Sequence, residues 1–286
     1  MRYCVIGSGG YIGGFLCEHL ERQGHIVDRV SSSSGGIDPV TGLIRDLVLA
    51  NVDVVVYLAQ SPFYRQLPQR APHLLAVNCV SAVNAAVIAK ASNVSKFIYA
   101  STGNVYQTSF DVFTEHSALE RGNWYSLSKV MGEEGLRLAA GEMDLTCLRI
   151  FGVYGPDQTD KLIPNLISRV LQGETITVDS QNAALEALPG GLRTNPIYIE
   201  DAVQAIEMVA MSRGVPVVNM AGDEVLSIKD MVEIIGDAVG VAPKIAVTDR
   251  RRSGDLIGDV SLFRSLYTKP LTSFKSGIKK VLEALQ

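Results

Sequence analysis

Short apolar runs rich in valine and isoleucine alternate with segments of helical period along most of the chain. Strands that are apolar at nearly every position are typical of a parallel sheet covered by helices on both faces. The alternation therefore predicts a doubly wound α/β fold. The predicted strands are Tyr3–Ile6, Ile26–Val30, Val52–Leu58, Phe97–Ala100, Leu145–Phe151 and Asn195–Ile199. The predicted helices between them are Tyr11–Gln23, Leu74–Ala91, Tyr125–Ala140 and Asp201–Met211.

The regular alternation weakens after Gly155-Pro156. We expect residues 1–156, to which residues 194–212 return, to form a first domain. Residues 157–193 and 213–286 are expected to form a smaller C-terminal lobe, partly interleaved with that domain. The elements predicted for this lobe are the helices Pro164–Gln172, Ser227–Val239 and Ser276–Leu285 and the strand Lys244–Thr248.

Composition excludes several classes of protein. The net charge of −4 provides no basic field for a phosphate backbone, so nucleic acid is not an expected partner. The four cysteines lie far apart and form neither a CxxC pair nor a Cys/His cluster, so we expect reduced thiols and no metal site. The N-terminus lacks the features of a signal peptide, and no apolar stretch reaches the roughly 18 residues of a membrane helix. We therefore expect a cytoplasmic protein that does not contact a membrane.

Three glycines, Gly7, Gly10 and Gly13, follow the first predicted strand and open the first predicted helix. In this context glycine allows a tight turn, close approach of a pyrophosphate and close packing of the helix on the strand. The helix N-terminus also favours negative charge. The loop, including Tyr11 and Ile12, is therefore predicted to bind a dinucleotide in a Rossmann-type domain, and the smaller lobe is predicted to bind the substrate.

A run of serines, Ser31 to Ser34, stands at the end of the second predicted strand, where an acid usually binds the ribose of NAD. Without that acid, the hydroxyls of Ser31 and Ser32 could bind the 2′-phosphate of NADP by donating hydrogen bonds to it. No arginine follows to neutralise the phosphate, however, and Asp28 or Arg29 could reach the ribose if the strand ended early. The expected cofactor is NAD or NADP, with a slight preference for NADP, and a plain solvated serine loop is the alternative.

Tyr125 and Lys129 lie four residues apart in a segment of helical period, so both side chains leave one face of the helix. The spacing alone is weak evidence. Ser101 and Thr102 strengthen it, because they end a strand at the carboxyl edge of the sheet, where doubly wound folds bind ligands. A hydroxyl there can hold a substrate oxygen, while the lysine lowers the pKa of the tyrosine and binds the nicotinamide ribose. Thr102, Tyr125 and Lys129 are therefore the predicted catalytic residues of a hydride transfer.

The sequence resembles an extended short-chain dehydrogenase/reductase of the nucleotide-sugar epimerase/dehydratase family over nearly its whole length. The motifs follow the family's order. They are GSGGYIG, RDL, VVYLAQ, VNCVSAVNAA, ASTGNVYQ, YSLSK, LRIFGVYGP, LIPNLI, RTNPIYIEDAVQAI, VVNMAG, RSGD and KPLTSFKSGIKKVLE.

This resemblance implies an NAD(P)-dependent enzyme that moves a hydride between nicotinamide and a sugar carbon of a nucleotide-sugar-like substrate. It implies further cofactor contacts from Asp46 and Leu47 at the adenine and from Ala59 and Gln60 beside the dinucleotide. The segment around Asn78 is implied to contact the cofactor as well.

One departure from the family bears on the reaction. Family dehydratases carry an acid pair directly after the catalytic threonine, where this chain has Gly103-Asn104. Neither residue exchanges a proton at neutral pH, so dehydration is disfavoured. Ser101 and Asn104 remain candidate substrate ligands.

A second departure concerns the substrate. Gly152 stands where the family usually has an asparagine that helps to hold the sugar nucleotide. Arg193 and Arg252 could still bind a diphosphate through paired donors, as the family's arginines do, or could be surface or ion-pair residues.

Three hypotheses for function remain at this stage. An epimerase would keep its cofactor through turnover, an NADP-dependent keto-sugar reductase would release it, and a non-catalytic dinucleotide sensor would not need the tyrosine. The helices Leu74–Ala91 and Tyr125–Ala140 carry small and apolar residues on more than one face. In the family the corresponding helices form a dimer interface, so a homodimer is possible, with packing against the sheet as the alternative.

Overall fold

Parallel strands form the central sheet of the computed structural model, which describes residues 1–180 and 190–285. Parts of the ranges 157–193 and 213–286 thus lie outside the described residues. The six-stranded sheet has the order β10-β5-β4-β3-β1-β2, and every neighbouring pair is parallel. This confirms the predicted doubly wound α/β class. The strands are β1 (Arg2–Ile6), β2 (Ile26–Val30), β3 (Val54–Tyr57), β4 (Lys96–Thr102), β5 (Asp144–Ile150) and β10 (Val217–Met220).

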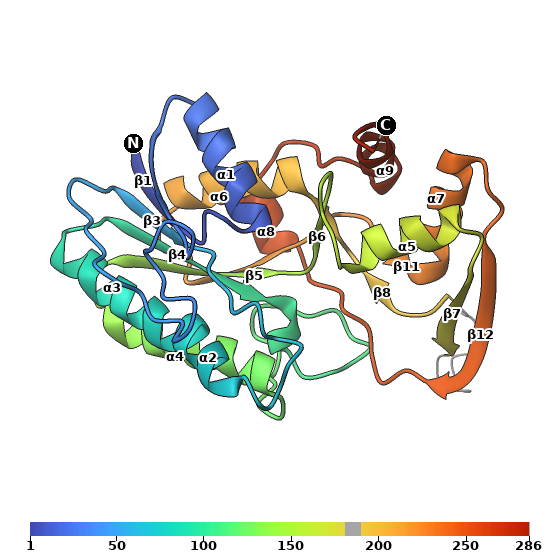
Figure 1. Ribbon diagram of the computed structural model, residues 1–286, viewed down its shortest axis with the longest axis horizontal. Helices are drawn as coiled ribbons and strands as arrows, with labels where there is room; N and C mark the ends of the chain where they lie inside the picture. Colours follow the sequence, from blue (N-terminus) through green and yellow to red (C-terminus); the bar gives the residue numbers. More distant parts are fainter. Residues whose placement is uncertain (181–189, 286) are drawn as a thin grey trace.

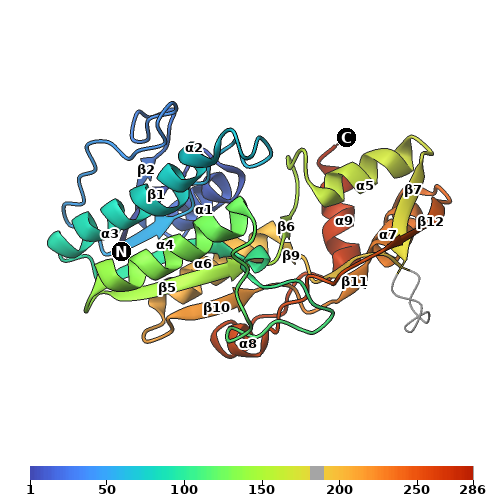
Figure 2. The same cartoon turned by 90° about the horizontal axis from the view of Figure 1, so that it is seen from below.

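Helices cover both faces of the sheet (Figures 1 and 2). On one face α1 packs against α6, and on the other α3 packs against α4. A π-helical stretch, η1, joins α2 to α3, so the single helix predicted here consists of three consecutive segments. Their bounds are α1 (Tyr11–Arg22), α2 (Ala71–Leu75), η1 (Ala76–Ser81), α3 (Ala82–Ala91), α4 (Trp124–Ala140) and α6 (Ile199–Met211), and a 3₁₀ turn, η2 (Gly103–Val105), follows β4.

The remaining elements lie mainly beyond the carboxyl ends of the strands, to the right in Figure 1. β7 pairs with β12 in parallel, and β8 pairs with β11 antiparallel. A short parallel pair, β6 and β9, lies between this part and the central sheet. These elements are β6 (Val153–Tyr154), α5 (Leu162–Leu171), β7 (Thr175–Ser180), β8 (Arg193–Thr194), β9 (Ile197–Tyr198), β11 (Leu226–Ser227), α7 (Ile228–Val239), β12 (Lys244–Arg251), α8 (Ser261–Leu266) and α9 (Phe274–Glu283).

Two segments differ from the expectation. The predicted strand Asn195–Ile199 contains only the two-residue β9, because Pro196 has no backbone N–H to donate to a ladder. The place beside β5 in the central sheet is taken instead by β10, which pairs Val217 with Cys147. Residues 217–220 therefore belong to the central sheet, although the range 213–286 was expected in the smaller lobe.

The segment Ala71–Ala91 corrects the expectation about apolar length. It has a mean hydropathy of 1.7 over a window of which 44% is buried, and among the described residues it is the one helical segment long and apolar enough to cross a membrane. Polar residues, among them His73 and Asn78, interrupt the apolar run, so the sequence shows no unbroken apolar stretch of this length. Length and composition alone do not distinguish such a helix from the core helix of a soluble protein.

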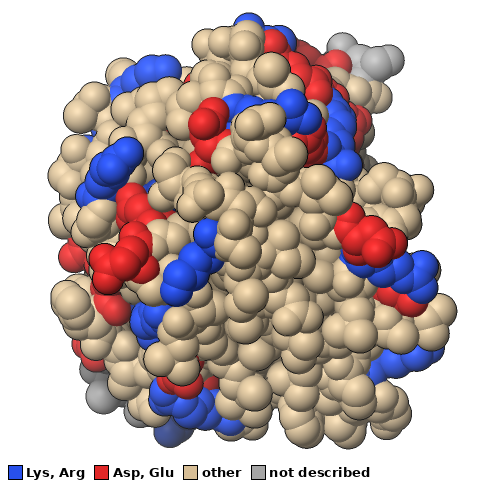
Figure 3. All heavy atoms as spheres, turned by 90° about the vertical axis from the view of Figure 1, so that its left-hand side faces the viewer, with Lys and Arg blue, Asp and Glu red and all other residues tan. Residues whose placement is uncertain are grey.

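Apolar side chains also remain at the surface of α3, α4 and the preceding turn. Val80, Val87, Met131 and Leu138 are 45%, 53%, 40% and 87% exposed. Figure 3, which shows the left-hand side of Figure 1, contains a broad area from its centre to its lower edge that few charged side chains interrupt. Val80 and Val87 are seven residues apart, as are Met131 and Leu138, so the members of each pair lie on one side of their helix.

Close packing of α4 on η1 depends on Gly132. A Cβ atom there would lie 2.5 Å from the Asn78 carbonyl oxygen and 2.5 Å from the Tyr99 hydroxyl oxygen. The Tyr99 hydroxyl donates to that same carbonyl at 2.6 Å, so neither atom can move freely. The helix that carries Tyr125 and Lys129 is thus held at a distance only glycine allows.

We expect Gly132→Ala to lower the free energy of unfolding by about 1–3 kcal/mol, the usual cost of overpacking a core. Gly14→Ala is the matched control, because a Cβ atom there meets nothing closer than 3.9 Å and alanine favours the helix by up to about 1 kcal/mol. Urea unfolding measures both changes. Equal stability of the two variants would contradict the packing described for Gly132.

Candidate active site

A cavity of about 920 Å³ opens at the carboxyl ends of the parallel strands, between the central sheet and the C-terminal elements. This size lies near the upper end of the roughly 300–1,000 Å³ typical of cofactor and ligand sites. Most of the predicted site residues line it. They are Gly7, Gly10, Tyr11, Ile12, Gly13, Ser31, Ser32, Ala59, Gln60, Ser101, Thr102, Asn104, Tyr125 and Lys129.

The glycine loop forms one wall of this cavity by close approach of backbone to backbone. A Cβ atom on Gly7, whose φ is +98°, would lie 2.5 Å from the Ala59 nitrogen. A Cβ atom on Gly13 would lie 2.2 Å from the Gly7 carbonyl oxygen. The Gly10 N–H donates to that carbonyl at 3.0 Å and closes the turn in front of α1. The loop thus leaves the helix N-terminus open toward the cavity, as anion binding requires.

The serine run forms a closed turn at the end of β2. The Ser31 N–H donates to the Ser34 hydroxyl at 2.9 Å, and the Ser34 N–H donates to the Ser31 hydroxyl at 3.1 Å. The Ser31 and Ser33 hydroxyls lie 2.8 Å apart. Ser31, Ser32 and Ser33 all line the cavity. The serine turn is therefore part of the cavity wall and not a solvated loop remote from the site.

Asp28 and Arg29 do not take the place of the missing ribose acid. The strand continues to Val30, and neither residue lines the cavity. Asp28 accepts two hydrogen bonds from Arg2, at 2.8 and 2.9 Å, and Arg29 donates two to Glu21, at 3.1 and 2.8 Å. The side chains of Asp28 and Arg29 are therefore engaged in ion pairs outside the cavity.

Asp46 and Leu47 lie outside the cavity, in a separate surface depression along β2. Ile37 and Asp38 line the cavity in their place. Asp46 has a positive φ of 40°, and Ile37 forms an isolated antiparallel bridge with Ile44. This hairpin-like path directs the acid of the RDL motif away from the cavity and corrects the position expected for the adenine contact.

Tyr125 stands at the centre of the predicted catalytic group. Its hydroxyl donates to the Gln60 side-chain oxygen at 3.2 Å. Burial raises the pKa of Tyr125 to about 12, and the Thr102 side chain partly offsets this rise. The Thr102 hydroxyl itself accepts from the backbone N–H and the side-chain amide of Asn104, both at 3.2 Å. Thr102 and Tyr125 therefore share one corner of the cavity, as predicted.

Lys129 lies one helical turn beyond Tyr125 and is 3% exposed. Its Nζ donates to the Ala100 carbonyl oxygen at 2.8 Å and lies 4.9 Å from the centre of the Tyr99 ring. Burial lowers the pKa of Lys129 to about 7, although the nearby Glu133 carboxylate opposes this shift. The ammonium group thus loses its proton as the pH rises through neutrality, far below the usual range for lysine.

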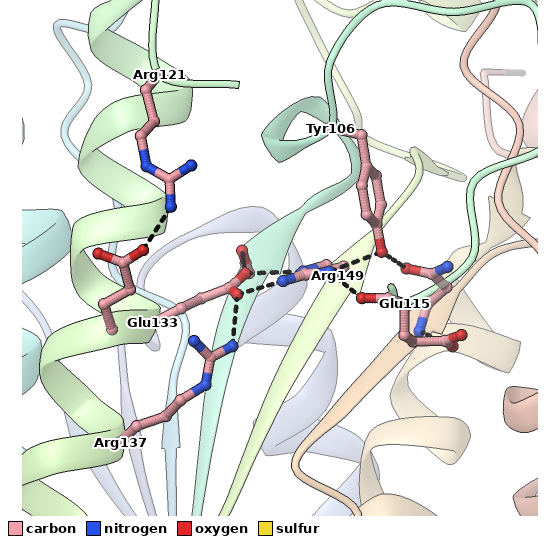
Figure 4. Close-up of polar contacts among 9 residues, drawn as sticks. Tyr106, Glu115, Arg121, Glu133, Arg137 and Arg149 are labelled. Atoms are coloured by element: carbon pink, nitrogen blue, oxygen red, sulfur yellow. Dashed lines mark hydrogen bonds and ion pairs between the residues drawn. The ribbon is translucent and has the colours of Figure 1, made fainter. Parts of the chain in front are cut away.

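Ser101 lines the cavity, but its hydroxyl donates to Glu133 Oε1 at 2.5 Å. Glu133 in turn forms a buried ion pair with Arg149 of β5 (Figure 4). The sequence did not indicate the Glu133–Arg149 ion pair. Helical period does place an acid on the same face as Lys129, but the partner on a different strand appears only in the structure.

Asn78 is fully buried and does not line the cavity, contrary to the expectation of a cofactor contact. Its Nδ2 donates to the Ser128 hydroxyl at 3.0 Å, next to Lys129. The backbone carbonyls of Val77 and Asn78 accept from the hydroxyls of Tyr57 and Tyr99, each at 2.6 Å. The side chain of Asn78 therefore contacts the helix that carries Lys129, while its Oδ1 has no hydrogen-bond partner among the described residues.

Gly103 and Asn104 fill the position of the dehydratase acid pair. A Cβ atom on Gly103 would lie 2.7 Å from the ring of the buried Phe151, so a larger side chain does not fit there. The Asn104 amide donates to Thr102. Among the residues that the structure describes, no carboxyl group forms a hydrogen bond with the Thr102 hydroxyl.

Arg193 and Arg252 converge on Asp255, and neither lines the cavity. The Arg193 Nε donates to Asp255 at 2.8 Å, and Arg252 Nη1 donates to the same carboxylate. The Nε and Nη2 of Arg252 are buried and have no hydrogen-bond partner within residues 1–180 and 190–285. The structure thus shows an ion-pair cluster, in which one guanidinium retains unused donors.

A further aromatic and cationic contact was not expected from the sequence. Lys161 lines the cavity, and its Nζ donates to the Tyr64 hydroxyl at 2.8 Å. The Tyr64 ring centre lies 6.2 Å from that of Tyr125. This contact joins the segment after β3 to the segment before α5 beside the catalytic group, and no local motif indicates it.

Comparison with known proteins agrees with this geometry. The family model described as "NAD dependent epimerase/dehydratase family" matches residues 3–221. YtcB of Bacillus subtilis (strain 168), named as an uncharacterized UDP-glucose epimerase, is 26% identical over 321 residues that cover 97% of this chain and 96% of that protein.

Solved structures share the fold over nearly the whole chain. One is the UDP-N-acetylglucosamine 4-epimerase of Methanobrevibacter ruminantium M1, with a TM-score of 0.84, 21% identity and coverage of 99% and 97% of the two chains. Another is MoeE5 in complex with UDP-glucuronic acid and NAD, with a TM-score of 0.81, 22% identity and coverage of 100% and 99%. These structures share the fold, and the family model that matches residues 3–221 shows the family: the chain belongs to the NAD-dependent epimerase/dehydratase family of enzymes.

Proposed function

We propose that the protein is an NAD-dependent epimerase of a nucleotide-linked sugar, most simply a UDP-hexose. The carrying observation is that Thr102, Tyr125 and Lys129 meet the glycine loop in one cavity, while the Thr102 hydroxyl bonds to Asn104 and, within residues 1–180 and 190–285, to no carboxyl group. Hydride transfer with proton exchange at one oxygen is the chemistry that this set of groups supports. The names of the relatives, which include UDP-sugar epimerases, support the nucleotide-linked substrate.

The cavity fits a dinucleotide. The glycine loop, the N-terminus of α1 and the Ala59 backbone would hold its pyrophosphate. Gly7 and Gly13 let the loop pack against the backbone of residues 58–59 and leave the helix N-terminus at the cavity wall. Lys129 would hold the nicotinamide ribose. When bound, the nicotinamide supplies the hydride acceptor and donor.

The chain's own groups favour NAD over NADP, which reverses the slight preference drawn from the serine run. Asp38 lines the same cavity as Ser31 and Ser32. Backbone N–H donors of Thr41 and Val40 lower the pKa of Asp38, so its carboxylate is charged at neutral pH. Asp38 also forms an ion pair with Arg45, and its Oδ1 accepts from the N–H groups of Val40 and Thr41, so the carboxylate is held at the cavity wall. An acid in this position accepts a ribose hydroxyl more readily than a 2′-phosphate. The solved structure of MoeE5 is a complex with UDP-glucuronic acid and NAD.

Tyr125 would exchange the proton of the substrate hydroxyl or carbonyl oxygen. Thr102 would orient that oxygen through its own hydroxyl, and the Lys129 ammonium would stabilise the phenolate form of the tyrosine. Burial raises the pKa of Tyr125 to about 12, so the tyrosine needs this nearby cation to act as a base near neutral pH.

The substrate would extend from this corner along Phe151, Gly152 and Val153 toward Leu192 and Leu256. Gly152 has nothing within 4 Å of a hypothetical Cβ atom, so the space usually occupied by an asparagine is open. We propose that the buried unpartnered donors of Arg252 bind the substrate diphosphate after a local adjustment of its ion pair with Asp255.

We also propose that two copies associate through the exposed apolar residues of η1, α3 and α4. Burying Val80, Val87, Met131 and Leu138 in a helix-to-helix interface removes apolar surface from water. This arrangement also accounts for the apolar character of Ala71–Ala91 without a membrane.

The variant Tyr125→Phe tests the catalytic assignment. We expect turnover to fall about a hundredfold or more, because proton transfer by a positioned side chain contributes about 10²–10⁴-fold. Binding of NAD, measured by titration, is expected to persist. Tyr267→Phe removes a hydroxyl outside the cavity and serves as the matched control. Unchanged turnover in Tyr125→Phe would contradict the assignment of Tyr125 as the proton-exchanging residue.

Dissociation constants of NAD⁺ and NADP⁺ test the cofactor preference. We expect NAD⁺ to bind about tenfold more tightly or better, since each factor of ten corresponds to about 1.4 kcal/mol of repulsion avoided. Asp38→Asn should narrow the difference, whereas Asp46→Asn, which lies outside the cavity, should leave it unchanged. Tighter binding of NADP⁺ to the wild-type protein is the contradicting outcome.

Sedimentation equilibrium tests the dimer. We expect Leu138→Glu to shift the protein from dimer to monomer, because a carboxylate buried in an apolar interface is unpaired. Val40→Glu, at a loop residue that is 80% exposed, is the matched control and should remain dimeric. A monomeric wild-type protein at micromolar concentration would contradict the proposed interface.

A further inference from the structure

A buried carboxylate that the proton transfer above does not use lies one helical turn beyond Lys129. Glu133 has no exposed surface. Its Oε1 accepts from Ser101 Oγ at 2.5 Å and from Arg149 Nε at 3.0 Å, and its Oε2 accepts from Arg149 Nη2 at 2.6 Å (Figure 4). The carboxylate thus connects the helix of Tyr125 and Lys129 with two strands of the sheet.

The partners of Glu133 hold it in one place. Arg149 lies directly opposite Ser101 in the register of β4 and β5. The third nitrogen of its guanidinium, Nη1, donates to the Tyr106 hydroxyl and to the Glu115 carbonyl oxygen, both at 2.9 Å. With every guanidinium nitrogen engaged, Arg149 cannot move without breaking several hydrogen bonds, so the position of the Glu133 carboxylate is fixed as well.

Stability alone does not explain such an ion pair. Replacing a buried ion pair by apolar residues of similar volume is often neutral or stabilising, because both charges must be desolvated. Glu133 and Arg149 are nevertheless almost completely buried, at 0% and 2% exposure, immediately behind the cavity wall. Glu133 joins this pair to the cavity through the Ser101 hydroxyl, and it lies one helical turn from Lys129.

Glu133 and Lys129 are buried one helical turn apart on the same face of α4. Among the described residues, the Nζ of Lys129 has one hydrogen-bond acceptor, the Ala100 carbonyl oxygen. Burial lowers the pKa of Lys129, and the Glu133 carboxylate is the group that raises it again. The other titratable groups near these two residues are Tyr99, whose ring faces Lys129, and Tyr125, one helical turn before Lys129 on α4. Cys147, Arg137 and Arg149 lie around Glu133.

We propose that Glu133 is a positioning residue of the reaction, which keeps the Lys129 ammonium group charged beside Tyr125 and holds the Ser101 hydroxyl at the cavity wall. The proposal rests on the proposed function, since the charge of Lys129 affects turnover only if Tyr125 exchanges the substrate proton. Arg149 has a supporting part, because it keeps the carboxylate ionised and in place.

The titration of Lys129 itself is the direct test. NMR of lysine side chains labelled with ¹³C and ¹⁵N, with the Lys129 signal assigned from Lys129→Met, gives its midpoint without substrate or cofactor. We expect Glu133→Gln to raise the acid dissociation constant of Lys129 about tenfold or more, which is one pH unit. Glu133→Asp keeps the charge and should restore most of the midpoint.

The neighbouring Glu134 provides the matched control. Its carboxylate is exposed and binds Arg121 at 2.7 Å on the outer face of α4 (Figure 4). Glu134→Gln should leave both the Lys129 midpoint and the pH dependence of turnover unchanged. In Glu133→Gln, by contrast, the alkaline limb of the turnover profile should move to lower pH by the same amount as the midpoint.

A second variant keeps the test decisive if Glu133→Gln does not fold. The double variant Glu133→Gln/Arg149→Met removes both charges of the ion pair and should also lower the titration midpoint of Lys129. An unchanged midpoint in a folded variant overturns the inference, as does a shifted midpoint with an unchanged turnover profile. A protein whose Lys129 midpoint follows Glu133 but which converts no nucleotide sugar contradicts the proposed function alone.

Discussion

The burial of one ammonium group at the carboxyl edge of the sheet is the constraint on which the site depends. Removing the charge of Lys129 from water is costly, and the structure compensates with the Ala100 carbonyl, the face of Tyr99 and the carboxylate of Glu133. These partners lie on β4 and on α4 itself, so the helix and the strand must stay in close contact. Gly132 allows that contact.

The parallel sheet brings the remaining parts of the site to the same edge. The turn from β1 to α1 supplies the glycine loop, the end of β3 supplies Ala59 and Gln60, and the end of β4 supplies Thr102. Because every strand points the same way, segments far apart in the sequence meet where the strands end. The C-terminal elements close the cavity from the other side, and the open space at Gly152 leaves room for a sugar.

Local motifs predicted the parts of the site that local geometry determines. The glycine loop requires small residues within one turn, and the spacing of Tyr125 and Lys129 follows from helical period, so both are visible in the sequence. Asp38 was missed because the chain between β2 and β3 has no periodicity, and its path depends on a bridge between Ile37 and Ile44. The convergence of Arg193 and Arg252 on Asp255 also depends on contacts that sequence patterns do not reveal.

The central claim is that a hydride leaves the sugar and returns to the same carbon while Tyr125 exchanges only the oxygen proton. Incubation of the wild-type protein with UDP-hexoses in D₂O, without added cofactor and followed by ¹H NMR, tests this claim directly. The account predicts that a second epimer appears and that its ring carbons carry no deuterium, since the returning hydride does not exchange with solvent. Deuterium at the inverted carbon, or no conversion of any UDP-hexose by protein that holds NAD, would contradict it.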